Sequence, residues 1–267
     1  MTTQISKWQC KISPTLGGGF AGTPNQVWGT TDYKDLDKPT VFFGVYGLPD
    51  LMAVRQHRGR KAILWAGTDC LYLINGYWLD DKGDFRLDPK VVGAYLNKTC
   101  ENWCENNLEY KELLSVGIKA KVCPSYLGDV SKIKPTKKDY DILRGYISVS
   151  GDDFKAYGWD RLDELVKDLP GLTVYCYGNT KPYKFKSKNI IVRGRVTQEE
   201  MNKETQRMHL AIRLNKHDGF SEVLAKGLLM EQGIISDIEY PFLTMQPKKA
   251  REWLLKNINK YPWNKNI

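Results

Sequence analysis

The sequence predicts an α/β protein built on parallel sheets. Short apolar runs rich in β-branched and aromatic residues alternate with stretches whose apolar residues recur at helical spacing. The chain has 267 residues, enough for two small domains. This alternation is typical of doubly wound parallel sheets, in which a helix connects each strand to the next.

The first half, residues 1–135, is expected to form a small N-terminal domain. Its apolar runs predict buried strands at Thr40–Val45, Lys61–Trp65 and Ile118–Val122, and Pro89–Leu114 is expected to hold two helical stretches. Asp129–Asp139 contains Pro135 and several lysines, and we interpret it as the linker between domains.

Residues 136–246 alternate more regularly and predict a second domain. The expected strands are Tyr146–Ser150, Leu172–Tyr177, Asn189–Val192, His209–Leu214 and Gly233–Ser236. The expected helices are Trp159–Asp168, Thr197–Met208 and Ser221–Glu231. Thr197 and Glu200 have the spacing of a capping box, with Thr197 as N-cap. Residues 247–267 are expected to form a helix, Pro247–Asn257, and a basic tail.

Ligands of open parallel sheets bind outside the carboxyl ends of the strands. This rule predicts a site at the loops Gly151–Tyr157, Gly178–Lys181, Gly194–Val196 and Asn215–Ser221. In the last loop, Gly219 would let a ligand approach the backbone, and the N–H groups of a helix starting near Ser221 could bind a phosphate. Asp218 could accept hydrogen bonds from sugar hydroxyls. A simple N-cap at Ser221 and a turn residue at Asp218 would explain the same pattern.

The charge and the cysteines bear on partners and location. The formal net charge is +9, and the basic tail also carries Trp253, Tyr261 and Trp263, so it could contact nucleic acid or an anionic membrane surface. A solvated helix with a frayed end is the alternative. No continuous apolar stretch approaches the length of a membrane span, and the six cysteines are scattered without an export signal. We therefore expect reduced thiols and a cytoplasmic protein.

Several motifs together resemble those of a known enzyme family. Asn189–Ser236 resembles the donor-binding half of the retaining family-four glycosyltransferases, which have the GT-B fold. The matching residues, in order, are Gly194, Glu199-Glu200-Met201, Ala211-Ile212-Arg213-Leu214, Asp218-Gly219-Phe220-Ser221 and Ile234-Ile235. Upstream, Val149-Ser150-Gly151 with Lys155 is similar to the strand and basic loop that hold the donor diphosphate, and the Gly178 turn also fits. Trp65-Ala66-Gly67-Thr68-Asp69 looks like a turn of some members.

The resemblance implies two Rossmann-like domains facing across a cleft, with the C-terminal segment crossing back to the first domain. It implies Asp218 and Lys155 as catalytic residues. The implied donor-binding residues are Gly151, Lys155, Gly178, Arg213, Asp218, Gly219, Phe220, Ser221, Glu222 and Lys226. The Gly-rich run Gly17, Gly18 and Gly19 would face the donor phosphates, and Trp65, Thr68 and Asp69 would lie on the acceptor side.

Two positions depart from the family pattern. The family often pairs two glutamates eight positions apart, and here Asp218 and Lys226 stand at these places. A lysine cannot accept hydrogen bonds from ribose hydroxyls, so Lys226 would bind phosphate or Glu222 would take the acceptor role. Leu64 stands where some members have a histidine, and His57 and His217 are the candidates to substitute for it.

The predicted activity is transfer of a hexose or pentose from a UDP- or GDP-sugar to a hydroxyl group, with retention and without a metal. Basic residues would stabilise the departing diphosphate, and no Asp-x-Asp motif follows a predicted strand. We expect no tightly bound cofactor. The acceptor would be a hydroxymethylated DNA base or an envelope glycan or lipid. The alternative is a non-catalytic nucleic-acid-binding protein on the same scaffold. A dehydrogenase is disfavoured because no Gly-x-Gly-x-x-Gly follows the first predicted strand, Thr40–Val45.

Overall fold

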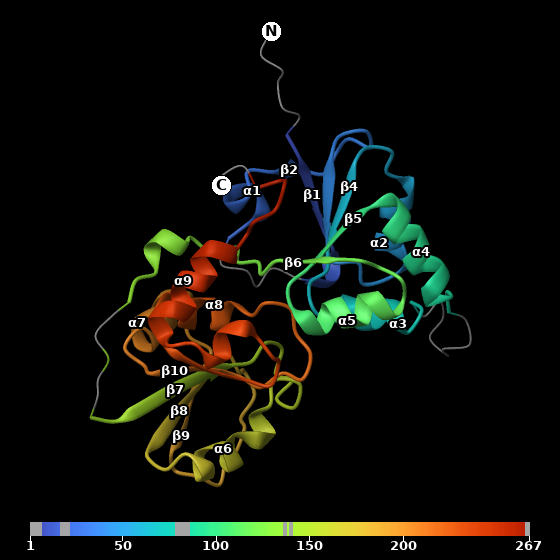
Figure 1. Cartoon of the computed structure of the whole chain (residues 1–267). Coiled ribbons are helices and arrows are strands. Elements are labelled where there is room, and N and C mark those ends of the chain that lie inside the picture. The colour runs from blue at the N-terminus through green and yellow to red at the C-terminus, as the bar shows by residue number, and fades with distance from the viewer. Residues whose placement is uncertain (1–6, 17–21, 78–85, 136–137, 139–140, 265–267) are drawn as a thin grey trace. The chain divides into compact units, whose positions relative to one another are not determined.

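The computed structural model describes residues 7–16, 22–77, 86–135, 138 and 141–264. The chain divides into two compact units. Unit 1 comprises Met1–Asp129, His217–Phe220 and Asn257–Ile267, and unit 2 comprises Val130–Lys216 and Ser221–Lys256. Each unit holds one sheet of parallel strands flanked by helices (Figure 1). The predicted α/β fold with parallel sheets is therefore confirmed.

The sheet of unit 1 has six strands in the order β2-β1-β3-β4-β5-β6. Its strands are β1 (Gln9–Ile12), β2 (Thr31–Asp32), β3 (Thr40–Phe43), β4 (Lys61–Leu64), β5 (Glu101–Cys104) and β6 (Lys121–Val122). Its helices are α1 (Pro24–Val27), α2 (Leu48–Gln56), α3 (Asp69–Ile74), α4 (Pro89–Thr99) and α5 (Asn107–Ser115), with a 3₁₀ turn at Pro14–Leu16. The strand β5 interrupts the segment for which only helices were predicted, and β1, β2, α2 and α3 were not predicted.

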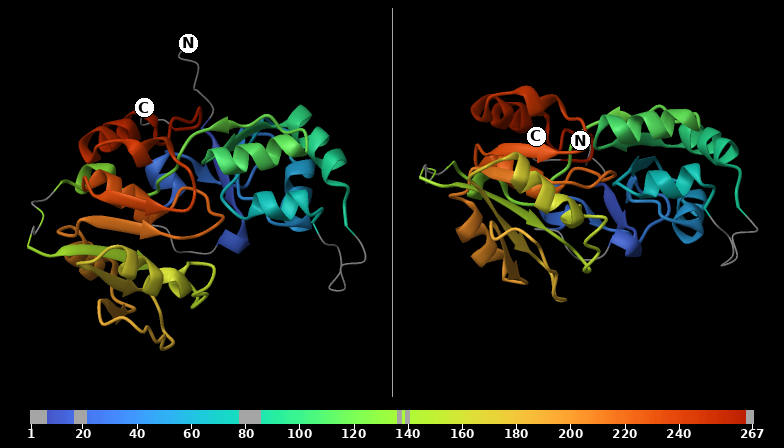
Figure 2. Two further views of the ribbon diagram at one scale, coloured as in Figure 1. Left: turned by 60° about the horizontal axis from the view of Figure 1, so that its bottom comes forward. Right: turned by 90° about the horizontal axis from the view of Figure 1, so that it is seen from below.

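Both faces of this sheet are buried, as its apolar runs indicate. Phe42 and Ile63 face a core that includes residues of α2, α3, α4 and α5. Figure 2 shows these helices, blue to green, together beside the strands of unit 1. Phe43 and Leu64 face the second core, to which Tyr261 from the C-terminal segment belongs.

The sheet of unit 2 has five strands in the order β11-β10-β7-β8-β9. Its strands are β7 (Leu143–Ser148), β8 (Leu172–Tyr177), β9 (Ile190–Gly194), β10 (Leu210–Arg213) and β11 (Gly233–Ser236). Its helices are α6 (Leu162–Asp168), α7 (Gln198–Thr205), α8 (Glu222–Leu229) and α9 (Pro247–Asn257), with 3₁₀ turns at Val130–Lys132, Trp159–Arg161 and Pro241–Thr244. All the predicted strands and helices of this part are present. The capping box is confirmed, because Thr197 accepts from the N–H of Glu200 and Glu200 accepts from that of Thr197.

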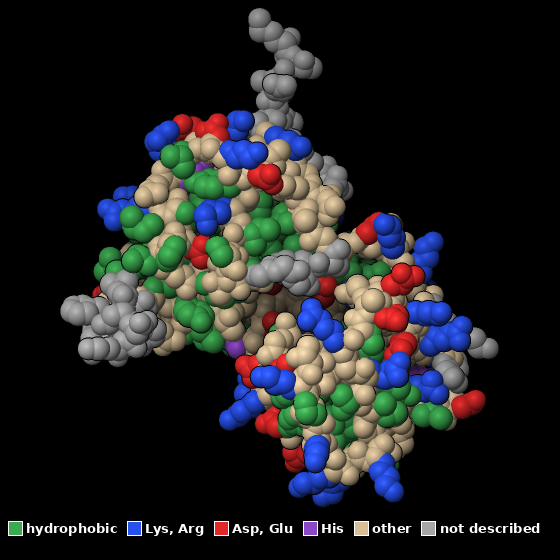
Figure 3. Space-filling view, turned by 180° about the vertical axis from the view of Figure 1, so that it is seen from behind, with side chains coloured by type: hydrophobic (Ala, Val, Ile, Leu, Met, Phe, Trp, Pro, Cys, Tyr) green, Lys and Arg blue, Asp and Glu red, His purple; other side chains and the backbone are tan. Residues whose placement is uncertain are grey.

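The aromatic residues near the C-terminus are structural. Tyr261 and Trp263 are buried in unit 1, with ring centroids 4.6 Å apart in a stacked arrangement. Trp253 in α9 packs against Phe242, with ring centroids 5.3 Å apart. The expectation that Tyr261 and Trp263 contact nucleic acid or a membrane, or fray with the tail, is corrected by this burial, whereas Trp253 is half-buried. On the face drawn in Figure 3, Lys and Arg side chains are spread among acidic ones. No helix in the described part of the chain is long and apolar enough to cross a membrane.

Candidate functional site

The loops that follow β7 and β8 are tied together at the carboxyl edge of the unit 2 sheet. Gly151 adopts a φ of +67°, and the next residue, Asp152, accepts hydrogen bonds from the N–H groups of Thr180 (2.7 Å) and Lys181 (3.2 Å). The Thr180 hydroxyl also donates to Asp152, and this bond lowers the pKa of the carboxyl group. The loop that carries Lys155 is thus closed onto the loop after β8.

Two predicted cations belong to this edge. Lys155 is exposed in the loop after β7. Arg213 ends β10, and its guanidinium carbon lies 4.5 Å from the ring centroid of Tyr157, which belongs to the same loop as Lys155. Because a cation–π contact favours this placement, Arg213 is held beside the loop. The arrangement brings two cationic residues, Lys155 and Arg213, to the carboxyl edge of the sheet.

The start of α8 combines a cap with an ion pair. Ser221 is the N-cap and accepts a hydrogen bond from the N–H of Val223 at 3.2 Å. One turn apart on the same helix, the Lys226 ammonium lies 3.6 Å from the Glu222 carboxylate. The Lys226 side chain is only 9% exposed, and burial lowers its pKa. Lys226 and Glu222 therefore neutralise each other, so a direct role of either in binding phosphate or ribose would first require this pair to separate.

The turn formed by Asp218, Gly219 and Phe220 belongs to unit 1, although we predicted it as part of the second domain. The Phe220 N–H donates to Glu105 Oε2 at 2.7 Å. Asn106 Nδ2 donates to the carbonyl oxygens of Asp218 (2.8 Å) and Gly219 (3.4 Å). Asp218 Oδ1 accepts from the N–H of Gly219 at 3.1 Å.

Gly219 is needed for the close packing of this turn within unit 1. A Cβ atom at Gly219 would overlap Glu105 Oε2 and lie 3.2 Å from the backbone nitrogen of Gly67. Gly67 adopts a φ of +96°, and a Cβ there would lie 3.0 Å from the nitrogen of Gly219. We expected Gly219 to let a ligand approach the backbone. In the structure a protein carboxylate fills that space.

Three buried carboxyl groups surround this turn. Asp69 accepts from the N–H groups of Val45, Ala66 and Cys70 at 3.0–3.1 Å. Glu109 accepts from the N–H groups of Gly67, Glu105 and Asn106. Burial raises the pKa of Asp69 to about 7, and it also raises those of Glu105 and Glu109.

Sequence reasoning missed Glu105, Asn106 and Glu109, for which a signal was present. Asn106 and Glu109 form a capping box at the start of α5, and Glu105 directly follows β5. Had β5 been recognised, the rule that ligand-facing residues follow the strands of parallel sheets would have marked Glu105. Asp69 and Glu109, with Cys70, place three potential metal ligands within 4.8 Å, but the carboxylate oxygens already accept backbone N–H groups.

The buried carboxyl groups predict a pH-dependent stability. Asp69 in the folded chain keeps its proton to about pH 7, whereas in the unfolded chain it ionises near pH 4. The free energy of unfolding should therefore fall as the pH rises from 4 to 8, by up to about 4 kcal/mol from this residue. Urea unfolding of the parent and of Asp69→Asn should show the smaller fall in the variant. Parallel pH profiles would contradict the assignment.

The residues predicted on the acceptor side are mostly inaccessible. Trp65 is completely buried, and its indole N–H donates to Asn102 Oδ1 at 3.1 Å. Asp69 is also completely buried, so only Thr68 is exposed. Direct contact of Trp65 or Asp69 with an acceptor is therefore corrected to a structural role. Gly17, Gly18 and Gly19 lie outside the described residues.

The two histidines considered as substitutes at Leu64 are both engaged. His57 is buried, and its ring packs against those of Tyr33 and Phe42 at centroid distances of 5.8 and 5.6 Å. Burial lowers the pKa of His57. His217 Nε2 lies 2.8 Å from Glu112 Oε2, which anchors the residue just before the Asp218 turn.

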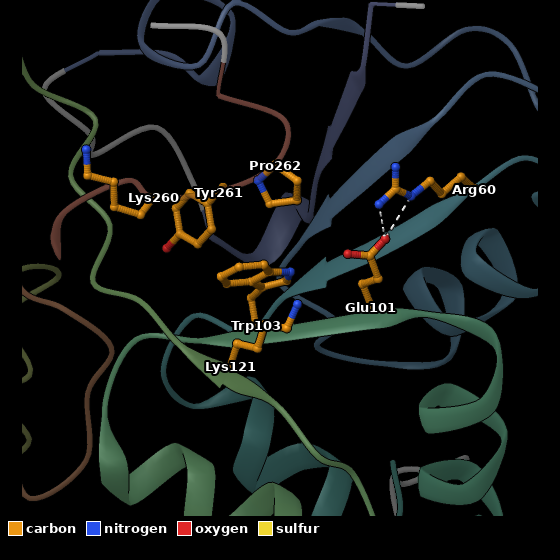
Figure 4. Close-up of a pocket in the computed structure, with 7 residues that line it drawn as sticks. All are labelled: Arg60, Glu101, Trp103, Lys121, Lys260, Tyr261 and Pro262. Atoms are coloured by element: carbon orange, nitrogen blue, oxygen red, sulfur yellow. Dashed lines mark hydrogen bonds and ion pairs between the residues drawn. The ribbon is translucent and has the colours of Figure 1, made fainter. Parts of the chain in front are cut away.

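A separate cavity of about 450 Å³ lies in unit 1 (Figure 4). Its lining residues are Arg60, Glu101, Trp103, Lys121, Lys260, Tyr261 and Pro262. Arg60 is bound to Glu101, and the Lys121 ammonium lies 4.9 Å from the ring centroid of Trp103. Arg60 and Glu101 stand where β4 and β5 begin, so this cavity is at the opposite end of these strands from Glu105. None of the predicted site residues lines it.

No family model and no curated protein matches the sequence. Structure comparison returns several glycosyltransferases and a putative UDP-N-acetylglucosamine 2-epimerase. TarM matches with a TM-score of 0.48 and 12% identity over 81% of this chain and 47% of its own. The pneumococcal O-GlcNAc transferase GtfA in complex with UDP and GlcNAc gives 0.45 and 12%, over 82% and 49%. Anabaena HepE in complex with UDP and glucose gives 0.47 and 12%, over 81% and 66%. The chain thus spans about half the length of TarM and GtfA, and at these values the likeness concerns the fold alone.

Proposed function

We propose that the chain is a glycosyltransferase that moves a sugar from a nucleoside diphosphate to an acceptor hydroxyl. The observation that carries the proposal is the carboxyl edge of the unit 2 sheet, where Arg213 is held against the loop of Lys155. Parallel sheets bind nucleotides at this edge, and two cations there suit a diphosphate. The N-terminus of α8, capped by Ser221, adds the positive end of a helix dipole.

The chemistry follows from these groups. As the bond between the sugar and the diphosphate breaks, negative charge grows on the departing phosphate oxygen. Lys155 and Arg213 stabilise that charge, which is the role a metal ion takes in other transferases. The Asp218 carboxylate, three residues before Ser221 in the chain, binds hydroxyls of the transferred sugar. We propose retention at the anomeric carbon and a UDP- or GDP-sugar as donor, on the resemblance to the retaining family.

For the acceptor, we propose two classes of molecule. We propose a cytoplasmic enzyme acting on a hydroxymethylated DNA base or on an envelope glycan or lipid. Burial of Tyr261 and Trp263 removes the two tail rings that base stacking would have used. DNA contact would then depend on phosphate pairing with lysines, which makes it strongly dependent on salt.

A thermal-shift panel of UDP, GDP and their sugars tests the donor assignment. A nucleotide present at about 100 times its Kd should stabilise the parent by about 2.7 kcal/mol, because it binds the folded state alone. Lys155→Ala and Asp218→Ala should lower the shift, the second only when the sugar is attached. Stabilisation by DNA alone, steeply reduced by salt, would instead favour the non-catalytic nucleic-acid-binding alternative.

A further inference from the structure

We propose that Glu105 and Asn106 form a dock in unit 1 that holds the Asp218–Phe220 turn and thereby positions the Asp218 carboxylate. The inference rests on the proposed function for its catalytic consequence. The dock itself is defined by contacts within unit 1 and is tested separately. Glu105 and Asn106 are positioning residues in this proposal, because they contact the turn and would act on the donor through it.

The dock engages successive backbone groups of the turn. Asn106 Nδ2 donates to the carbonyl oxygens of Asp218 and Gly219, and Glu105 Oε2 accepts the N–H of Phe220. The same Asn106 side chain accepts from the N–H of Glu109 at 3.0 Å through Oδ1, so its orientation is fixed by the start of α5. The Asn106 side chain therefore accepts a hydrogen bond from the start of α5 through Oδ1 and donates to the turn through Nδ2.

The turn supplies one of the hydrogen-bond donors that the buried Glu105 carboxyl group requires. Glu105 is 5% exposed, and its near ionisable neighbours, Asp218, Asp69 and Glu109, are all acidic. Its polar partners are the Ser125 hydroxyl on Oε1 and the Phe220 N–H on Oε2. A buried carboxyl group that loses a hydrogen-bond donor is costly. Glu105 thus favours the docked turn over the released one.

The two glycines provide the space that the dock needs. Gly67 and Gly219 face each other across the contact, and either Cβ would come too close to the opposing backbone or to Glu105. His217, bound to Glu112, adds a restraint just before the turn. The turn is covalently continuous with Ser221, the N-cap of α8, which the proposed function assigns to the donor site.

This arrangement predicts which functions depend on the dock. The Phe220 N–H already donates to Glu105, so it is not available to a ligand. In this proposal, the group of the turn that contacts the sugar is the Asp218 side chain. Releasing the turn should leave binding of the nucleoside diphosphate by Lys155 and Arg213 unchanged. It should weaken the contribution of the sugar and lower the rate of transfer. A general loss of folding would instead reduce both alike.

The test uses Asn106→Asp and Glu105→Ala in the full chain. Asn106→Asp keeps the acceptor that caps α5 but loses the N–H donor to the turn. Glu101→Gln is the matched control. Glu101 begins β5, the strand that Glu105 directly follows, but it is paired with Arg60 and not with the turn. Hydrogen exchange at the amides of residues 218–220 should quicken at least about tenfold in both dock variants and stay unchanged in the control.

Two outcomes separate the dock from the proposed function. Unchanged exchange at residues 218–220 in a folded Asn106→Asp protein would overturn the dock. If exchange quickens, calorimetry with UDP and UDP-glucose decides the catalytic part. We expect a UDP affinity within about twofold of the parent and a weaker gain from glucose. Equal loss of both would overturn positioning, whereas a parent that binds neither nucleotide would refute the proposed function and leave the dock standing.

Discussion

Replacing Trp263 by alanine should destabilise unit 1 by about 3–5 kcal/mol, the range found when a buried tryptophan is truncated. Trp263 is completely buried, and its ring centroid lies 5.8 Å from those of Trp8 and Trp103 and 6.2 Å from that of Trp28. Its indole N–H has no hydrogen-bond partner among the described residues, so the loss is one of packing. Urea unfolding followed by circular dichroism would measure it.

Lys260→Ala is the matched control for this change. Lys260 lies three residues earlier in the same segment and is exposed, so its replacement should alter the free energy of unfolding by no more than about 0.5 kcal/mol. Similar unfolding midpoints for Trp263→Ala and Lys260→Ala would mean that the C-terminal segment does not belong to the core of unit 1.

Replacing Gly178 by alanine should destabilise unit 2 by about 3–5 kcal/mol, from strain and overpacking together. Gly178 adopts a φ of +92°, and a Cβ atom there would overlap the carbonyl oxygen of Val149. Val149 is held in place because its N–H donates to the carbonyl of Tyr177 at 2.9 Å. Relief of the overlap would therefore break strand pairing beside the proposed donor loops. The thermal unfolding midpoint would report the change.

Gly151→Ala separates the two causes. Gly151 also has a positive φ, of +67°, but a Cβ atom there would have no neighbour within 4 Å. This variant should lose only the conformational cost, about 1–2 kcal/mol. If Gly178→Ala and Gly151→Ala were equally stable, the close approach of the Val149 carbonyl oxygen to Gly178 would be wrong.

The sheet of unit 2 could be predicted from sequence because its strands are continuous runs of residues that favour buried strands. Leu172–Tyr177 is a continuous run of residues suited to a strand buried on both faces, and Gly178 ends it. Thr197 and Glu200 predicted the start of α7, because a capping box depends only on two residues three positions apart. Local signals of this kind are readable without knowledge of the fold.

The strand β5 could not be predicted in the same way because half of its residues are polar. Asn102 is buried, and it is satisfied by contacts with distant groups: it accepts from the Trp65 indole and donates to the carbonyl of Leu96. A polar residue at a core position contradicts the apolar pattern unless its partners are known. The C-terminal segment posed a similar problem, since a charged, aromatic sequence can be solvated or, as here for Tyr261 and Trp263, buried.

The candidate site likewise combines features that local sequence indicates with contacts between residues far apart in the chain. The strand-end rule marked the loop Gly151–Tyr157, and the family resemblance implied Lys155 and Arg213. The structure places Arg213 on the ring of Tyr157 in the loop of Lys155. The partners of Asp218 and Phe220 were out of reach, because Asn106 and Glu105 lie more than 100 positions away in the chain. Lys226 was read as a possible ligand contact, whereas its burial and its pairing with Glu222 depend on how α8 packs.

The most direct test of the central claim is a calorimetric titration of UDP-glucose and GDP-mannose into the parent, Lys155→Ala and Lys121→Ala. Lys121 is the matched cation, because it lines the separate cavity in unit 1. We predict that the parent binds one donor and that Lys155→Ala weakens binding roughly tenfold to a hundredfold, the value of a charge-assisted hydrogen bond. Lys121→Ala should bind like the parent. Equal affinity in Lys155→Ala and the parent, or loss of binding in Lys121→Ala instead, would contradict a donor site at the carboxyl edge of the unit 2 sheet.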